Sequence, residues 1–231
     1  ELLMRPQSDS LKTPGDVLQI AQAQSKLHHI EHLSWMRGME TFCTLVEQEK
    51  IAPEKKVFIN SIGSQCMSDE EVAQFVERFG PYLNRIVLEI MESDPGNTAY
   101  TNYKVQTIRN WGGMVAVDDY GTGYNSGASL IFLSPDIVKL DMSIVRDIDK
   151  NTNRQALLKD LLSYVKSQNV QVLAEGVETQ GEMELLVAFG VEYIQGYYTG
   201  RPSYEPQPIP PNVVAAIRSA YQKRLSSPGQ V

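Results

Sequence analysis

The sequence predicts an α/β protein of the TIM-like (β/α) barrel type, and three observations support this fold class. Short apolar or β-branched runs alternate with segments of helical periodicity, as in successive βαβ units. Polar strand ends recur regularly, because Asn60 and Glu89 are 29 residues apart and Glu89 and Asp118 are again 29 apart. One βαβ unit takes about 30 residues. No G-x-G-x-x-G follows the first strand, which disfavours an open doubly wound dinucleotide-binding sheet.

Seven short runs bounded by turn residues are expected to be strands. They are "ELLMR" (1–5), "KVFIN" (56–60), "RIVLEI" (85–90), "MVAVDD" (114–119), "DIVKLD" (136–141), "VQVLAE" (170–175) and "VEYIQGY" (191–197). A closed barrel needs eight strands, so we expect the missing first strand upstream of Glu1. The chain is interpreted as one domain, residues 1–231, excised from a larger protein and ending in a frayed tail at about 226–231.

Helical segments occupy the connections between these runs. Residues 13–50 are expected to form two helices, and 152–169 carries an apolar stripe at helical spacing. In 68–80, Ser68 and Glu71 have the spacing of a capping box at a helix start.

Composition excludes several classes of protein. The 231 residues are 42% hydrophobic and 21% charged, as in an ordinary globular domain. The net charge of −7 argues against binding a polymeric nucleic acid, and no apolar run is long enough for membrane contact by this domain. Cys43 and Cys66 lack CxxC spacing and indicate a reducing, cytoplasmic location for the domain, whereas membrane anchoring of a parent protein stays open.

Nearly every predicted strand ends in polar residues, which in a TIM barrel converge on the C-terminal mouth where active sites are built. These residues are Glu1, Arg5, Asn60, Glu89, Asp118, Asp119, Lys139, Asp141, Glu175 and Gln195. A plainer interpretation is that each residue only caps the helix that follows it. Acidic and amide oxygens from several strands, with a lysine, instead match a Mg²⁺ or Mn²⁺ site that activates water.

Asp118 and Asp119 also point to a bound cation, because adjacent carboxylates repel by about 4 kcal/mol at the effective dielectric of a protein surface unless a cation offsets the repulsion. Successive strand residues face opposite ways, so both can point inward only if Asp119 lies past the regular strand. Gly121 and Gly123 would let the chain turn sharply after it. We therefore expect Asp118 to bridge two cations and Asp119 to reach the second, as in two-metal phosphoryl transfer.

These motifs resemble those of the EAL domain, the bacterial family of cyclic di-GMP phosphodiesterases. The signature Glu-Ala-Leu is similar to "ELLMR", and the other family motifs resemble runs that follow in the same order. These are "FINS" at Asn60, "EIME" at Glu89 to Glu92, "DDYGTG" at 118–123, "KLD" at 139–141, "EGVE" at 175–178 and "QGY" at 195–197.

The resemblance implies a role for each matching residue. The implied metal ligands are Glu1, Asn60, Glu89, Asp118, Asp119 and Glu175. Glu175 is alternatively the general base, and Lys139 would hold the attacking water. The implied substrate-binding residues are Leu3, Arg5, Asp141 and Gln195, and the supporting residues are Glu92, Glu178, Gly121 and Gly123. Glu92 is expected to anchor the loop after Asp119.

The implied activity is hydrolysis of cyclic di-GMP to linear 5′-pGpG with Mg²⁺ or Mn²⁺ in a two-metal site. The resemblance also implies a homodimer through the loop after Asp119, and covalently linked sensor or cyclase-like domains in a parent signalling protein. One alternative is a non-catalytic receptor that binds cyclic di-GMP without cutting it. A second is an enolase-type barrel with magnesium and a lysine base, acting on a carboxylic acid.

The histidines offer a weaker metal signal. His28 and His32 have helical i, i+4 spacing, but no HExxH is present. We interpret them as part of a solvated helix face.

Overall fold

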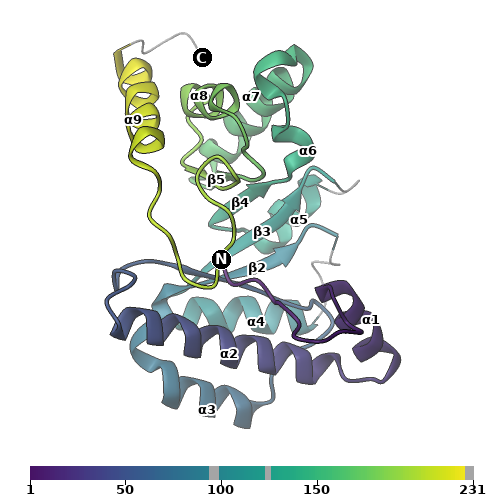
Figure 1. The fold of residues 1–231 in the computed structure, drawn as a ribbon. Helices are drawn as coiled ribbons and strands as arrows, with labels where there is room; N and C mark the ends of the chain where they lie inside the picture. Colours follow the sequence, from purple (N-terminus) through teal and green to yellow (C-terminus); the bar gives the residue numbers. More distant parts are fainter. Residues whose placement is uncertain (94–98, 123–125, 227–231) are drawn as a thin grey trace. The chain divides into compact units, whose positions relative to one another are not determined.

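Strands and helices alternate along most of the chain, as the sequence predicts (Figure 1). The computed structural model describes residues 1–93, 99–122 and 126–226, and for 126–129 only the backbone. Two compact units are present, Glu1–Ala116 (unit 1) and Val117–Val231 (unit 2).

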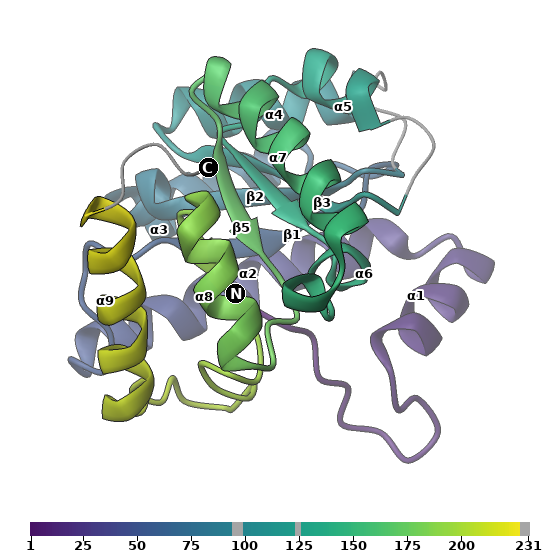
Figure 2. The same cartoon turned by 90° about the horizontal axis from the view of Figure 1, so that it is seen from above.

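In its described residues, unit 1 combines parallel strands with α-helices. Its helices are α1 (Pro14–Ala23), α2 (Leu27–Glu47), α3 (Asp69–Phe79) and α4 (Ala99–Asn110), with a 3₁₀ segment η1 (Gly80–Arg85). Strands β1 (Val57–Asn60) and β2 (Ile86–Met91) pair in parallel, with Asn60 opposite Glu89. α2 and α3 lie side by side (Figures 1 and 2). Trp35 and Phe75 join them edge to face at 5.8 Å, in the core of this unit.

The predicted helix starts in unit 1 are confirmed. The range 13–50 contains two helices, and 68–80 contains α3. Ser68 accepts the backbone N–H of Glu71, while the Glu71 carboxylate accepts the N–H of Ser68, which is the predicted capping box. These two bonds satisfy backbone donors that have no partner within the helix.

Strand β3 (Met114–Tyr120) starts in unit 1 and ends in unit 2, where β4 (Ile137–Leu140), β5 (Gln171–Ala174) and β6 (Tyr193–Ile194) follow it. β4, β5 and β6 pair in parallel in chain order. The helical segments of this unit are α5 (Ser126–Leu133), α6 (Met142–Val145), η2 (Ile148–Lys150), α7 (Thr152–Ser167), α8 (Gln180–Phe189) and α9 (Pro211–Ser226). α8 and α9 lie side by side in both views (Figures 1 and 2).

The strand order confirms the fold class. The six strands are ordered in the sheet as they are in the chain. This is the order of a TIM-like (β/α) arrangement, whereas a doubly wound sheet reverses its strand order at a switch point. Among the described residues, no helix has both the length and the apolar character needed to span a membrane.

The first and last predicted strands are wrong in extent. Residues 1–5 form only an isolated parallel bridge, between Leu2 and Ile59, with the Leu2 N–H donating to Phe58 at 3.0 Å. Pro6 has no N–H with which to extend a ladder. The final strand is limited to Tyr193–Ile194, because the chain turns at Gly196, where φ is +155°.

Candidate metal centre

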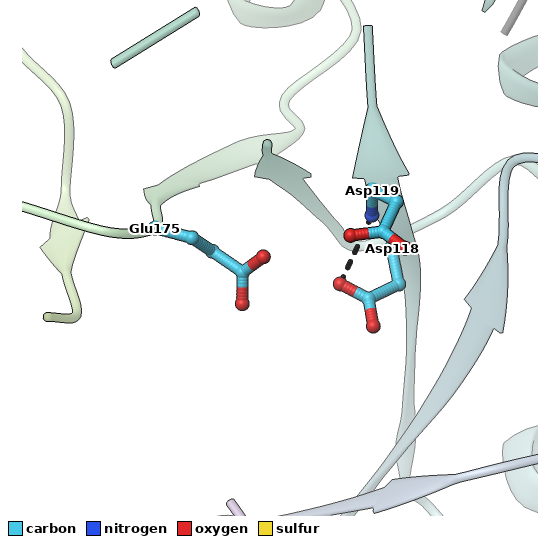
Figure 3. A group of neighbouring side chains, drawn as sticks. All are labelled: Asp118, Asp119 and Glu175. Atoms are coloured by element: carbon cyan, nitrogen blue, oxygen red, sulfur yellow. Dashed lines mark hydrogen bonds between the residues drawn. The ribbon is translucent and has the colours of Figure 1, made fainter. Parts of the chain in front are cut away.

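Three carboxylates gather at the carboxyl ends of β3 and β5 in unit 2. Asp118 and Asp119 lie near the end of β3, and Glu175 directly follows β5. One carboxylate oxygen of each lies within 4.8 Å of the others. Figure 3 shows Glu175 extending toward the two aspartates. The structure therefore brings together three of the ligands that the sequence predicts.

Asp119 has a left-handed backbone, with φ of +54°, and this interrupts the regular alternation of β3. Aspartate tolerates that conformation better than most residues. The Asp119 N–H donates to Oδ1 of Asp118 at 3.0 Å. Our expectation that Asp119 lies past the regular strand is wrong, because β3 continues to Tyr120. Gly121 is also left-handed, with φ of +106°, and Gly123 lies outside the described residues.

Lys139 lies between two of these carboxylates. Its Nζ is 2.8 Å from Oδ1 of Asp118 and 3.0 Å from Oε1 of Glu175, and its side chain is 1% exposed. Three carboxylates and one ammonium carry a summed formal charge of −2. Burying such a charge is costly unless it is compensated. The net negative charge and the oxygen atoms of the three carboxylates therefore fit a divalent cation.

Backbone hydrogen bonds fix the segment that carries Glu175. The N–H of Glu175 donates to the carbonyl of Leu140 at 3.1 Å, on β4. On the other side, the N–H of Gln195 donates to Ala174 at 2.8 Å, and its carbonyl accepts from Val177 at 3.0 Å. Gln195 thus directly follows β6 and is hydrogen-bonded to both neighbours of the segment that carries Glu175, as expected from its place at a strand end.

Glu178 follows in the same loop and pairs with Arg146. The guanidinium binds both carboxylate oxygens, with Nη2 to Oε1 at 2.7 Å. This hydrogen bond lowers the pKa of the Glu178 carboxyl. Such bidentate pairing is the strong form of an arginine–carboxylate hydrogen bond. The sequence carries no signal for Arg146 as the partner.

Glu182 is a supporting residue that our sequence reasoning missed. It is 1% exposed, and its carboxylate accepts the backbone N–H groups of Asp147 at 2.8 Å, Glu178 at 2.9 Å and Thr179 at 3.0 Å. Burial raises the pKa of Glu182, but these backbone hydrogen bonds outweigh burial and leave the pKa below its ordinary value. The run from Thr179 to Glu182 has the spacing of a capping box, so the sequence did contain a pattern that points to Glu182.

Asp141 serves as the cap of α6. Its Oδ1 accepts the N–H of Ser143 at 2.8 Å, and its own N–H donates to Tyr120 at 3.1 Å. Capping, the plainer interpretation of a polar strand end, accounts for this contact. Its expected role in substrate binding stays a prediction.

A second set of predicted ligands lies in unit 1. Nδ2 of Asn60 donates to Oε1 of Glu1 at 3.4 Å, and Asn60 pairs in register with Glu89 on β2. Glu89 is 1% exposed. Strand pairing places Asn60 beside Glu89, and the side-chain hydrogen bond joins Asn60 to Glu1, so these three residues are neighbours, as predicted.

The remaining predicted site residues of unit 1 are Leu3, Arg5 and Glu92. Leu3 and Arg5 are exposed, and Arg5 donates to the carbonyl of its neighbour Met4 at 2.9 Å. Glu92 is buried. Its expected contact with the loop after Asp119 involves residues outside the described set, and it stays a prediction.

The histidine interpretation needs correction. His28 Nε2 lies 3.0 Å and His32 Nδ1 2.9 Å from the same oxygen of Glu71, so these side chains face α3 rather than solvent alone. Within the described residues, the Asp118, Asp119 and Glu175 set is the one group of three or more His, Cys, Asp or Glu side chains close enough to share a metal ion.

Two solved structures share this fold. A standalone versatile EAL protein from Vibrio cholerae O395, in its c-di-GMP bound form, superposes with a TM-score of 0.76 at 23% identity, over 92% of this chain and 88% of that one. Klebsiella pneumoniae BlrP1, in a manganese and cy-diGMP complex, gives a TM-score of 0.69 at 22% identity, over 87% of this chain and 50% of that one. At these identities the likeness shows the fold.

Sequence comparison identifies the family. The cyclic di-GMP phosphodiesterase PdeF of Escherichia coli (strain K12) is 28% identical over 209 residues, which cover 87% of this chain. The chain spans 27% of that relative's length. The EAL domain model matches residues 1–202. The chain therefore belongs to the EAL domain family.

Proposed function

We propose that this chain hydrolyses cyclic di-GMP to linear 5′-pGpG in a metal-dependent reaction. The observation that carries the proposal is the meeting of Asp118, Asp119 and Glu175 around buried Lys139, in a chain of the EAL family. The naming of PdeF as a cyclic di-GMP phosphodiesterase supports the choice of substrate.

The proposed ligands of Mg²⁺ or Mn²⁺ are the six residues that the family resemblance implies. They are Glu1, Asn60, Glu89, Asp118, Asp119 and Glu175. All six supply carboxylate or amide oxygens, the donors that these hard cations prefer. Two cations held there would polarise the phosphoryl oxygens and favour deprotonation of a bound water. The manganese complex of BlrP1 supports the choice of metal.

Hydrolysis adds one water across one P–O bond. The water oxygen joins phosphorus, the bond to the leaving sugar oxygen breaks, and that oxygen takes up a proton. Lys139 donates a hydrogen bond to the attacking water, and Glu175 accepts its proton, roles that match their 3.0 Å contact. Leu3, Arg5, Asp141 and Gln195 would hold the dinucleotide, while Glu92, Glu178, Gly121 and Gly123 would support the site.

Replacing one predicted ligand tests this proposal. We expect Asp118→Asn to lose at least about 100-fold in turnover, because an amide is a weaker ligand and carries no charge. The rate of pGpG formation, followed by chromatography, measures the effect. Asp147→Asn is the matched control, because it makes the same chemical change at an aspartate that lies on the surface and pairs with Lys150.

Near-normal turnover in Asp118→Asn would contradict the ligand assignment. Binding of cyclic di-GMP without turnover in the wild-type protein would instead identify a receptor module. Failure to bind any guanine dinucleotide would favour an enolase-type enzyme.

We further propose that the domain acts in the cytoplasm as a homodimer, linked in a parent protein to sensor or cyclase-like domains. PdeF supports the linked domains, since this chain spans only 27% of its length. On α5, which follows the loop after Asp119, Ile131 and Phe132 are 69% and 60% exposed, and these apolar side chains suit a dimer contact. A monomer at micromolar concentration in sedimentation velocity would contradict the dimer.

A further inference from the structure

A buried ion pair in unit 1 lies apart from the predicted ligands. Glu31 of α2 is 2% exposed and Lys104 of α4 is 4% exposed. Lys104 Nζ lies 3.1 Å from Oε1 of Glu31. Neither residue belongs to the family motifs named above, and the proposed chemistry does not use them.

The pair holds the two residues that follow Asn60. Oε2 of Glu31 accepts the backbone N–H of Ile62 at 2.8 Å, and Oε1 accepts the hydroxyl of Ser61 at 3.2 Å. Lys104 donates to the carbonyl of Ile62 at 2.8 Å and also contacts the Ser61 hydroxyl. The N–H of Ile62 is thus held by Glu31 and its carbonyl by Lys104, which are the two members of one ion pair.

One more bond extends the same arrangement. Thr101, which lies one turn before Lys104 on α4, donates from Oγ1 to the carbonyl of Gly63 at 3.4 Å. The segment from Ser61 to Gly63 is therefore tied to α2 and α4 by side chains rather than by a strand ladder.

A buried ion pair is a poor means of stabilising a fold, because desolvation offsets most of the Coulomb attraction, and apolar residues of similar volume often do as well. Burial raises the pKa of Glu31, while Lys104 and the Ile62 and Ser61 hydrogen bonds oppose that rise. All three Lys104 donors have partners, so the network is rigid. Directional bonds of this kind fix geometry better than apolar packing does.

We propose that Glu31 and Lys104 are positioning residues for Asn60, and that they hold the end of β1 so that the Asn60 side chain meets its metal ion. The proposal rests on the proposed function, in which Asn60 is a ligand. Asn60 is joined directly to Ser61, so a shift of the clamped segment moves the Asn60 backbone with it. Residues that orient metal ligands typically contribute about 10–100-fold to metal affinity.

The test compares Mn²⁺ binding by the wild-type protein and by the double variant Glu31→Met/Lys104→Met. This change removes every hydrogen bond that Glu31 and Lys104 make to the segment yet leaves no unpaired buried charge, and methionine fills a similar volume. We expect Mn²⁺ affinity, measured by electron paramagnetic resonance of the free ion, to fall by about 10–100-fold. At saturating Mn²⁺ the KM for cyclic di-GMP should stay unchanged. Hydrogen exchange in a peptide covering 57–65 should rise.

Met39→Ala is the matched control. Met39 lies on the same helix as Glu31 and is fully buried, so its truncation loosens unit 1 without removing a hydrogen bond of Glu31 or Lys104. We expect its Mn²⁺ affinity to match the wild type. An equal loss of affinity in Met39→Ala would reduce the ion pair to a structural role and overturn the proposal.

Glu31→Asp provides a second variant should the double variant fail to fold. It keeps the charge but withdraws the carboxylate from the Ile62 N–H by one methylene, and we expect a smaller loss of Mn²⁺ affinity in the same direction. Wild-type affinity in both variants overturns the positioning role while leaving the proposed function intact. A wild-type protein that binds no Mn²⁺ overturns the proposed function itself, and the positioning role with it.

Discussion

Lys139 shows how a single residue shapes the candidate site. Its ammonium contacts Asp118 and Glu175 at 2.8 and 3.0 Å while its side chain is buried. Removing one partner of a buried ion pair typically costs about 3–5 kcal/mol, because the other charge is left without compensation. A divalent cation bound by the same carboxylates would restore that compensation.

Lys139→Met should therefore separate catalysis from metal binding. We expect turnover of cyclic di-GMP to fall by about 100-fold or more, because the attacking water loses its donor. Mn²⁺ affinity should stay the same or rise, because a positive charge beside the carboxylates is removed. Parallel turnover and Mn²⁺ titrations measure both effects.

Lys150→Met, at an exposed lysine paired with Asp147, is the control and should change neither quantity. A loss of Mn²⁺ affinity in Lys139→Met would show that this lysine instead organises the ligands.

For single residues, the sequence predicted which side chains meet at the site better than it predicted their backbone conformations. Asp118, Asp119 and Glu175 were expected together because they end parallel strands, and they are together. The left-handed φ of Asp119 was missed, because the adjacent glycines offered a simpler explanation for the turn. The Arg146 partner of Glu178 was missed because it depends on tertiary contacts across 32 residues of chain.

Among the elements, the turn after β6 has the strictest backbone requirement. Gly196 has a φ of +155°, and a Cβ there would lie 2.2 Å from the carbonyl oxygen of Val177 and 2.4 Å from its nitrogen. Real Cβ atoms essentially never approach backbone so closely. The loop after β5, which begins with Glu175, therefore packs directly on this glycine.

Gly196→Ala should destabilise the protein by about 1–3 kcal/mol, because the two segments must separate to admit the methyl group. Urea denaturation measures the change. Gly200→Ala is the matched control in the same loop, since its Cβ would meet nothing within 4 Å, and we expect a change within about 0.5 kcal/mol. Equal stabilities of the two variants would contradict the tight packing at Gly196.

Elements with strong local signals were predicted well. β1 and β2 lie within one residue of their expected limits, and α3 starts at its capping box. The two terminal predictions, 1–5 and 191–197, failed in extent because a strand needs ladder partners along its whole length. Apolar composition alone does not show where those partners end.

Across the molecule, the order of strands in the sheet follows the order in the chain. That order was predictable, because the spacing of polar strand ends matches the length of a βαβ unit. In each unit the predicted ligands are neighbours, Glu1, Asn60 and Glu89 in one and Asp118, Asp119 and Glu175 in the other. That these six residues bind metal ions is our proposal, since sequence patterns specify neither distances nor ions.

The most direct test of the central claim is to incubate the purified chain with cyclic di-GMP and Mg²⁺, beside a matched sample containing EDTA, and to separate the products by chromatography. We predict 5′-pGpG in the first sample and intact cyclic di-GMP in the second. Equal pGpG formation in both samples would contradict the metal-dependent chemistry, and intact cyclic di-GMP in both would contradict the enzymatic activity.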